Sequence, residues 1–234
     1  MVCFPQRFSI SFQEAKEIIN KGLIGQINYM RGNFRFSMKR NGDIHGGWVF
    51  DRRLGGGLIL ESSVHLWDAT RFITGKEIKN VIGIAREKNI NSAPFEDSFT
   101  AIANLDDECI ACIDMSGALP LESPTDKRFE ILGNEGCIYI DEFRNYITVN
   151  SERGIEANPG ELIKGLTYPD VMWHSNIEGG VKRLQREFID CIIEDREPSP
   201  GVEDGARATE ITLSIIDSLS SKRLEEVIYG IKKG

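Results

Sequence analysis

The stretch DSFTAIANLDDECIACIDMSG, residues 97–117, contains two runs of alternating apolar and polar residues on either side of the turn signal LDDE. Alternation with a period of two is typical of a β-strand whose side chains point alternately to opposite faces of a sheet. Because a tight turn joins the two runs, we expect them to pair antiparallel. The segment therefore predicts the centre of an antiparallel sheet.

Further short strands are predicted on both sides of this hairpin. They are bounded by turn signals such as GNEG, and each is rich in β-branched and aromatic residues. The predicted strands are QINYMRGNFRFSMKR at 26–40, VIGIARE at 81–87, RFEILG at 128–133, CIYIDE at 137–142 and YITVN at 146–150. Consecutive short strands with tight connections favour a large, mainly antiparallel sheet.

Helical patterns lie toward the two ends of the chain. Ser11 and Glu14 have the spacing of a capping box, and Gly22 stands where a helix of this length would end. Three more helices are predicted: LILESSVHLWDATRFIT at 58–74, an amphipathic helix over 181–192, and a last helix around 211–216. The prediction is one α+β domain over residues 1–234, with helices covering one sheet face. The other face is expected to pack against another subunit.

Composition limits the classes of partner. The chain has 36 Asp and Glu against 28 Lys and Arg, a formal charge of −8, so a nucleic-acid partner is not expected. No apolar run approaches the ~20 residues of a membrane-spanning helix, and no secretory signal is recognisable. We therefore expect no membrane partner and a cytoplasmic location. The five cysteines are interpreted as free thiols. Cys109 and Cys112 would point to opposite faces of a strand, so they could not share a metal ion.

The segment GGGLILESSVHLWD, residues 55–68, holds the candidate chemistry. On a helix Glu61, His65 and Asp68 form one stripe, at i, i+4 and i+7, between two apolar faces. Such a stripe is expected to line a cleft. A histidine beside carboxylates should have a raised pKa, which suits proton transfer near neutral pH.

Simpler interpretations compete with this one. A Glu–His pair at i, i+4 is usually only a satisfied surface pair, and His45 is expected to face solvent. His174 could lie at the mouth of a cleft and is kept as a candidate substrate-binding residue. Metal-dependent hydrolysis by Glu61, His65 and Asp68 is the least favoured alternative, so no metal is expected.

Four segments, in order, resemble the C-terminal, substrate-binding and oligomerisation domain of the glucose–fructose oxidoreductase, inositol dehydrogenase and rhizopine-catabolism (Gfo/Idh/MocA) family of oxidoreductases. The resemblance covers essentially the whole chain, and the glycine–histidine–aspartate block is its most specific part. The segments are VCFPQRF with AKEIINKGLIGQI, WVFDRRLGGGLILESSVHLWD, FEILGNEGCIYI, and FIDCIIEDREPSPGVEDGARATEITLSIIDS.

The resemblance implies roles for individual residues. His65 falls on the family's catalytic histidine, which takes a proton from a substrate hydroxyl while hydride passes to nicotinamide. Glu61 falls where many members have an aspartate that contacts the substrate and supports this histidine. Arg7, Asp68 and Trp48 match positions near the substrate, and Asp51 matches the same block more weakly.

The resemblance also implies what this chain needs from elsewhere. It has neither the G-x-G-x-x-G loop of a Rossmann domain nor the family's E-K-P lysine. NAD or NADP is therefore expected only with a separate Rossmann-domain half, and tight binding by this chain alone is not expected. The implied function is the substrate-binding and catalytic-histidine half of an NAD(P)-dependent sugar or polyol dehydrogenase, inactive in isolation. It is expected to form a homo-oligomer, a dimer or tetramer, through the open sheet face. The alternative is a non-enzymatic oligomerisation or ligand-binding module.

Overall fold

The computed structural model describes residues 1–39, 48, 54–55, 57–90, 93–144, 146–158, 161–163 and 177–230. The described helices and 3₁₀ turns are η1 (Pro5–Phe8), α1 (Ile10–Asn20), α3 (Gly57–Thr74), η3 (Asp106–Glu108), α4 (Ile177–Ile193) and α5 (Val202–Ser221). The described strands are β1 (Ile27–Arg35), β2 (Ile78–Ile90), β3 (Ala93–Leu105), β4 (Ile110–Ser116), β5 (Asp126–Gly133), β6 (Gly136–Asp141), β7 (Tyr146–Ser151), β8 (Ile155–Asn158), β9 (Glu161–Ile163) and β10 (Glu225–Glu226).

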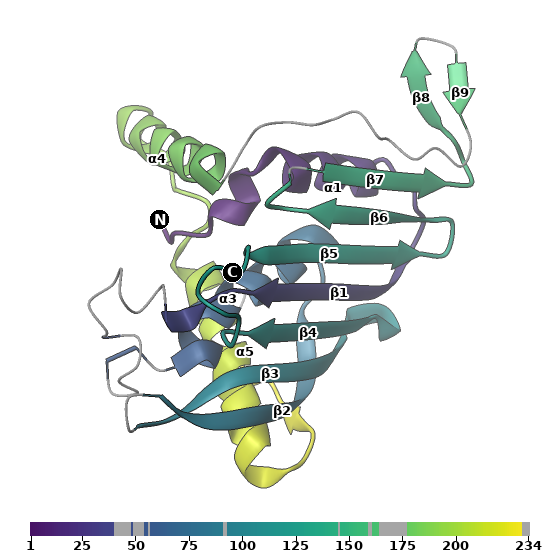
Figure 1. Cartoon of the computed structure of the whole chain (residues 1–234). Coiled ribbons are helices and arrows are strands. Elements are labelled where there is room, and N and C mark those ends of the chain that lie inside the picture. Colours follow the sequence, from purple (N-terminus) through teal and green to yellow (C-terminus); the bar gives the residue numbers. More distant parts are fainter. Residues whose placement is uncertain are drawn as a thin grey trace.

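An eight-stranded sheet forms the centre of the molecule, in the order β10-β2-β3-β4-β1-β5-β6-β7 (Figure 1). Its neighbours pair antiparallel except β1 and β4, which run parallel. The first strand of the chain therefore inserts between two strands that are consecutive in the sequence, β4 and β5. The predicted α+β class with a large, mainly antiparallel sheet is confirmed.

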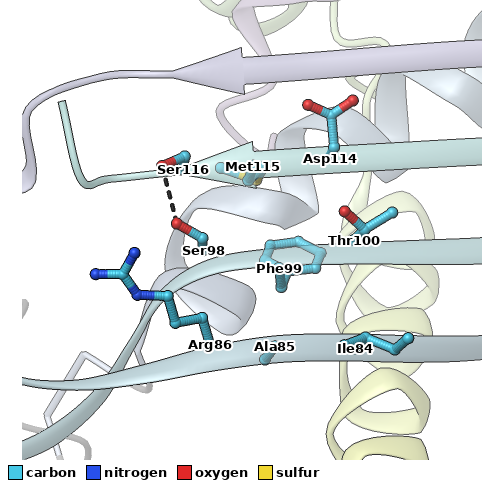
Figure 2. Close-up of a pocket in the computed structure, with 9 residues that line it drawn as sticks. All are labelled: Ile84, Ala85, Arg86, Ser98, Phe99, Thr100, Asp114, Met115 and Ser116. Atoms are coloured by element: carbon cyan, nitrogen blue, oxygen red, sulfur yellow. Dashed lines mark hydrogen bonds between the residues drawn. The ribbon is translucent and has the colours of Figure 1, made fainter.

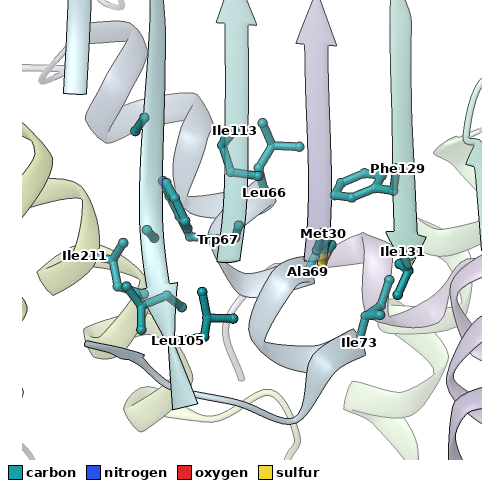
Figure 3. Packing of buried hydrophobic residues seen from close by; sticks show 14 of the residues in the cluster. Met30, Leu66, Trp67, Ala69, Ile73, Leu105, Ile113, Phe129, Ile131 and Ile211 are labelled. Atoms are coloured by element: carbon teal, nitrogen blue, oxygen red, sulfur yellow. The ribbon is translucent and has the colours of Figure 1, made fainter. Parts of the chain in front are cut away.

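The helices gather on one side of the sheet. α3 and α5 lie behind the strands in Figure 1, and α1 lies near β6 and β7. Between α3 and the strands, Trp67 and Leu66 of α3 pack with Met30, Ile113 and Phe129 of the sheet (Figure 3), and all five side chains are fully buried. The sheet residues on this face sit at alternate positions, as the sequence alternation predicts. The prediction that helices cover one face is confirmed.

The ends of α1 differ partly from the prediction. The helix begins at Ile10, with Ser9 at the N-cap and no side-chain cap, so the predicted capping box is wrong. Ser11 lies inside the helix and is buried. Gly22 does take the left-handed conformation that follows many helix ends, with φ 69°.

The other face of the sheet is open within the described part of the chain. Ile82 and Ile84 of β2, Ile102 of β3 and Ile110 of β4 are 38 to 78% exposed there. Cross-strand register places Ile82 directly opposite Ile102, which confirms that the two point to the same face. None of the described helices is long and apolar enough to cross a membrane.

Candidate functional site

The helix α3 is buried on both of its apolar flanks. Ile59, Leu66, Trp67 and Ile73 have at most 1% of their surface exposed, as expected for a helix with two apolar faces. Two buried hydroxyls on this helix are satisfied internally, because Ser63 donates to the Ile59 carbonyl and Thr70 to the Leu66 carbonyl. The polar stripe of the helix is therefore held in a fixed orientation by packing.

The imidazole of His65 lies half-buried against the edge of the Phe4 ring, with 5.7 Å between ring centroids. Its Nδ1 atom is buried and has no hydrogen-bond partner among the described residues. Burial, and then the positive charge of Lys127, lower the pKa of His65 to about 4. The expectation of a raised pKa is wrong, because burial disfavours the charged ring, and the nearby charge that adds to this effect is a lysine rather than a carboxylate.

Asp68 does not share the surroundings of His65. Its side chain is fully buried and receives two hydrogen bonds from Arg7, from Nε at 2.9 Å and from Nη2 at 2.6 Å. Arg7 Nη2 also donates to Asp204 Oδ1 at 2.7 Å, and Asp204 Oδ2 accepts from the Gly201 amide at the start of α5. Within the described structure, Arg7 and Asp68 therefore join η1, α3 and α5.

This ionic network continues at the far end of α3. Arg71 donates two hydrogen bonds to Glu77, at 2.8 and 3.0 Å, and its Nη1 atom lies 3.7 Å from Asp204. Arg207 of α5 lies 3.6 Å from the same Glu77. A buried charge is tolerated where several partners share it. The partners here come from both helices, so the network fixes α3 relative to α5.

Glu61 has a partner other than His65. On α3 it lies one helical turn before His65, its carboxylate accepts a hydrogen bond from the neighbouring Ser62 hydroxyl, and the side chain is partly exposed. The helical spacing of Glu61, His65 and Asp68 is correct, yet each has different partners. The spacing along the helix could not predict which other elements pack against each of its turns.

A buried charged pair that sequence reasoning missed joins β5 to the residue that follows β6. Lys127 Nζ is 3.1 Å from Glu142 Oε2, and both side chains are almost fully buried. Gln6 of η1 donates to Glu142 Oε1 at 3.4 Å. One signal was present in the sequence: strand alternation puts Lys127 on the same face as the buried Phe129 and Ile131.

The remaining predicted residues are less informative. Trp48 is described and is 43% exposed. His45, Asp51 and His174 lie outside the described residues. In the described portion of the chain, no three His, Cys, Asp or Glu side chains come close enough to hold a metal ion.

A hollow of about 460 Å³ lies on the open face of the sheet, across β2, β3 and β4 (Figure 2). Ile84, Arg86, Thr100 and Asp114 stand around it, and the hydroxyls of Ser98 and Ser116 are joined by a hydrogen bond at one end. His65 is on the opposite side of the sheet. The hollow is therefore separate from the surroundings of the histidine.

Comparison with known proteins gives one family match. A family model described as the GFO/IDH/MocA C-terminal domain matches residues 12–139, more than half of the chain. The match includes α3 with its histidine, the strands β1 to β5 and the first part of β6.

Relatives and solved structures agree with this match. The chain is 25% identical over 232 residues to myo-inositol 2-dehydrogenase of Thermotoga maritima, covering 96% of the chain and 64% of that protein. It is 28% identical over 158 residues to scyllo-inositol 2-dehydrogenase (NAD(+)) of Bacillus subtilis, covering 65% of the chain and 43% of that protein. A structure of levoglucosan dehydrogenase with NADH and levoglucosan has the same fold, with a TM-score of 0.80 and 20% identity, and the match covers 97% of the chain and 65% of that structure. The chain thus spans less than two thirds of the length of each.

Proposed function

The chain belongs to the GFO/IDH/MocA family as a C-terminal domain, and from this premise we propose that it is the substrate-binding, catalytic-histidine part of an NAD(P)-dependent dehydrogenase for sugars or polyols. Residues 1–234 form one domain in this proposal. The named relatives that support the substrate class are inositol dehydrogenases. The single observation that carries the proposal is the state of His65 on the buried helix α3.

His65 has the properties of a proton acceptor. Because burial and Lys127 lower its pKa to about 4, the imidazole is neutral at physiological pH and has one ring nitrogen free of a proton. The edge of the Phe4 ring fixes the plane of the imidazole, and packing on both sides fixes α3. When a substrate hydroxyl approaches, the ring accepts its proton, while the carbon-bound hydrogen leaves as hydride.

The hydride acceptor has to be held by other residues. Nicotinamide supplies this chemistry when it is bound, yet the sequence has no G-x-G-x-x-G loop to hold a dinucleotide pyrophosphate. The residues of this chain therefore do not fit a dinucleotide site. Their part in the proposed reaction is to bind the substrate and to accept its proton. In the proposal a separate Rossmann-domain half binds NAD or NADP, and this chain alone is inactive.

Glu61 is the candidate for substrate contact. It is partly exposed on α3, one helical turn before His65, and its carboxylate accepts a hydrogen bond from the Ser62 hydroxyl next to it. A carboxylate in that place accepts hydrogen bonds from hydroxyl groups of a sugar or polyol. Arg7 and Asp68 take a positioning role instead, since they hold η1 and α5 to the helix that carries His65.

The open sheet face supports association. We propose that two or four copies of the chain pack through β2, β3 and β4, where four isoleucines are exposed side by side. Burying this apolar face removes it from water, as C2 dimers commonly do with a self-complementary surface. The proposed location is the cytoplasm, consistent with the free thiols of the described cysteines.

A non-enzymatic oligomerisation or ligand-binding module is the second candidate. The observation in its favour is that neither Glu61 nor Asp68 supports His65 in the described structure. Under this alternative the helix is kept only for packing.

A fusion protein separates the two candidates. The chain would replace the matching part of the Thermotoga maritima inositol dehydrogenase, so that the N-terminal part of that enzyme supplies the cofactor site. We expect the fusion to oxidise an inositol or a sugar with NAD⁺. The increase in NADH absorbance measures this reaction. Calorimetry of the 234-residue chain with NADH and NADPH should show no micromolar binding. A folded fusion without turnover on a panel of such substrates would favour the non-enzymatic module.

A further inference from the structure

In the described structure the ring of Phe4 packs directly against the imidazole of His65. The two ring centroids are 5.7 Å apart, and the ring planes stand almost perpendicular, at 88°. Phe4 itself is only 3% exposed, so its ring belongs to the interior of the protein. A perpendicular contact at this distance is a favoured arrangement of two rings, and it limits how far either ring can turn. One side of the imidazole is therefore covered by an apolar side chain.

The residues before Phe4 are held at the start of α5. The Val2 amide donates to the Pro200 carbonyl at 2.9 Å, and the Phe4 amide donates to the Val2 carbonyl at 3.1 Å. The Val2 side chain also lies close to Gly205 of α5, because a Cβ atom added at this glycine would come within 2.9 Å of it. The backbone that leads to Phe4 is therefore packed against α5 and the turn before it.

The residues after Phe4 are held by other elements. Gly180 of α4 lies against Pro5, since a Cβ atom added at this glycine would come within 2.6 Å of the Pro5 carbonyl oxygen. Gln6 and Arg7 bind the buried carboxylates described above, the first just after β6 and the second on α3. The backbone is thus anchored on both sides of Phe4, and the ring cannot swing outward without breaking these contacts.

The imidazole of His65 depends on this apolar cover. Its Nδ1 atom is buried, and no described residue makes a hydrogen bond to it. Burial is also the largest cause of the lowered pKa of His65. Within the described residues, packing rather than hydrogen bonding at Nδ1 therefore holds the ring and limits its contact with water.

The charged groups on the described elements around α3 form a separate set of contacts. The positive charge of Lys127 on β5 adds to the effect of burial on His65. The other groups have partners of their own, which are Glu61 with Ser62, Arg7 with Asp68 and Asp204, Lys16 with the Ile73 carbonyl, Arg71 with Glu77, Arg207 with Glu203, Glu142 with Lys127 and Gln6, Asp97 with Arg86, and Asp114 with Arg31 and Arg35. Truncation of the Phe4 side chain would therefore change the hydration of the imidazole and remove none of these charged partners.

We propose that Phe4 is a positioning residue for His65: its ring excludes water from the imidazole and holds the imidazole in one plane. The anchored backbone on both sides of Phe4 keeps the ring in this place. The catalytic meaning of this inference rests on the proposed function, in which a neutral imidazole with a fixed orientation accepts the substrate proton. The contact itself, and its effect on hydration, do not depend on catalysis.

Histidine NMR tests the inference, because the chain contains only three histidines, His45, His65 and His174. The ¹⁵N-histidine-labelled 234-residue protein would be titrated downward from pH 8, with the His65 signal assigned from the His65→Gln variant. In Phe4→Ala we expect the titration midpoint of His65 to rise by about one pH unit, because water reaches the imidazole and stabilises its charged form. Phe4→Leu keeps most of the apolar cover, so its midpoint should stay close to that of the wild type.

Phe72→Ala is the matched control. Phe72 is half-buried on α3, about two helical turns after His65, and its ring centroid lies 5.4 Å from the guanidinium carbon of Arg7. This variant therefore removes a phenyl ring that packs against the same N-terminal segment, and its His65 midpoint should equal that of the wild type. An unchanged midpoint in folded Phe4→Ala, or an equal rise in Phe72→Ala, would overturn the inference.

The wild-type protein provides a second measurement if Phe4→Ala does not fold. Nuclear Overhauser effects between the ring protons of Phe4 and His65 are expected, and their absence would overturn the inference.

The fusion protein separates this inference from the proposed function. In an active fusion, Phe4→Ala should lower kcat about tenfold with little change in KM, because the imidazole is no longer held in the productive orientation. An unchanged kcat would contradict the positioning role. A fusion without any turnover would count against the proposed function alone, since the NMR midpoints need neither substrate nor cofactor.

Discussion

At the scale of single residues, burial determines the protonation state of His65. An exposed imidazole gains a proton near pH 6.5. In the structure the ring loses much of its contact with water and faces the Lys127 charge, so the pKa falls to about 4. The sequence places His65 correctly between two apolar faces, but the pKa falls because other elements bury the ring, and because Lys127, 62 positions away along the chain, adds its positive charge.

This shift predicts a pH dependence of stability. Between pH 6.5 and 4 the unfolded chain binds a proton at His65 that the folded chain does not. Protonation of His65 therefore leaves the free energy of unfolding unchanged well above pH 6.5. It lowers this free energy as the pH falls, by about 2 kcal/mol at pH 5. Urea unfolding of the wild type and of His65→Gln at pH 7.5 and 5 measures it. The wild type should lose more stability than the variant, and equal losses would contradict the shift.

At the scale of elements, local patterns predicted the strands well and their pairing less well. Alternation locates β2 to β7 because each strand has one buried and one open face. The parallel pairing of β1 with β4 could not be predicted, since it joins segments about 80 residues apart and leaves no local pattern. The capping box at Ser11 was wrong because the preceding turn η1 already brings the chain into the helix at Ile10.

The site follows the same division. The helix that carries His65 was found from its periodicity, and its burial on both sides is confirmed. Asp68 binds Arg7 of η1, which also binds Asp204 of α5. Lys127 pairs with Glu142, just after β6, and Glu142 also accepts a hydrogen bond from Gln6 of η1. Each of these contacts joins residues far apart in the chain, so spacing within one element could not predict them.

The network around Asp68 predicts a large loss of stability from Arg7→Ala. Without the guanidinium, Asp68 stays fully buried with its two strongest hydrogen bonds removed. We expect the unfolding free energy to fall by about 3 kcal/mol, as for other broken buried pairs. Lys21→Ala, which removes an exposed ion pair to Glu17, is the control and should cost less than about 1 kcal/mol. Equal costs in urea unfolding would show that the network does not hold the elements together.

At the scale of the whole molecule, the two faces of the sheet have different surroundings. One face carries the helices, His65 and the buried charges. The other face is open, with isoleucines on β2, β3 and β4 and, beside them, a chain of ion pairs among Arg35, Asp114 and Asp126 that satisfies itself. The apolar half therefore has the stronger drive to be covered.

Light scattering tests association through this face. We expect the wild-type protein to be a dimer or tetramer and Ile84→Asp to be smaller, because Ile84 is 78% exposed in the apolar half. Leu213→Asp is the matched control, as Leu213 is 47% exposed on α5, on the helix side. A wild-type monomer at high micromolar concentration would contradict the proposed oligomer, as would an unchanged assembly in Ile84→Asp.

The central claim is that His65 takes the substrate proton, and kcat of the fusion protein with and without this imidazole tests it most directly. Replacing His65 by Gln should lower kcat by about 10²- to 10⁴-fold, the usual contribution of a positioned general base, while the protein stays folded. Asn80→Ala, a change at a half-buried residue on the open sheet face, should leave kcat unchanged. If His65→Gln turned over substrate at the wild-type rate, the histidine would have no part in the reaction.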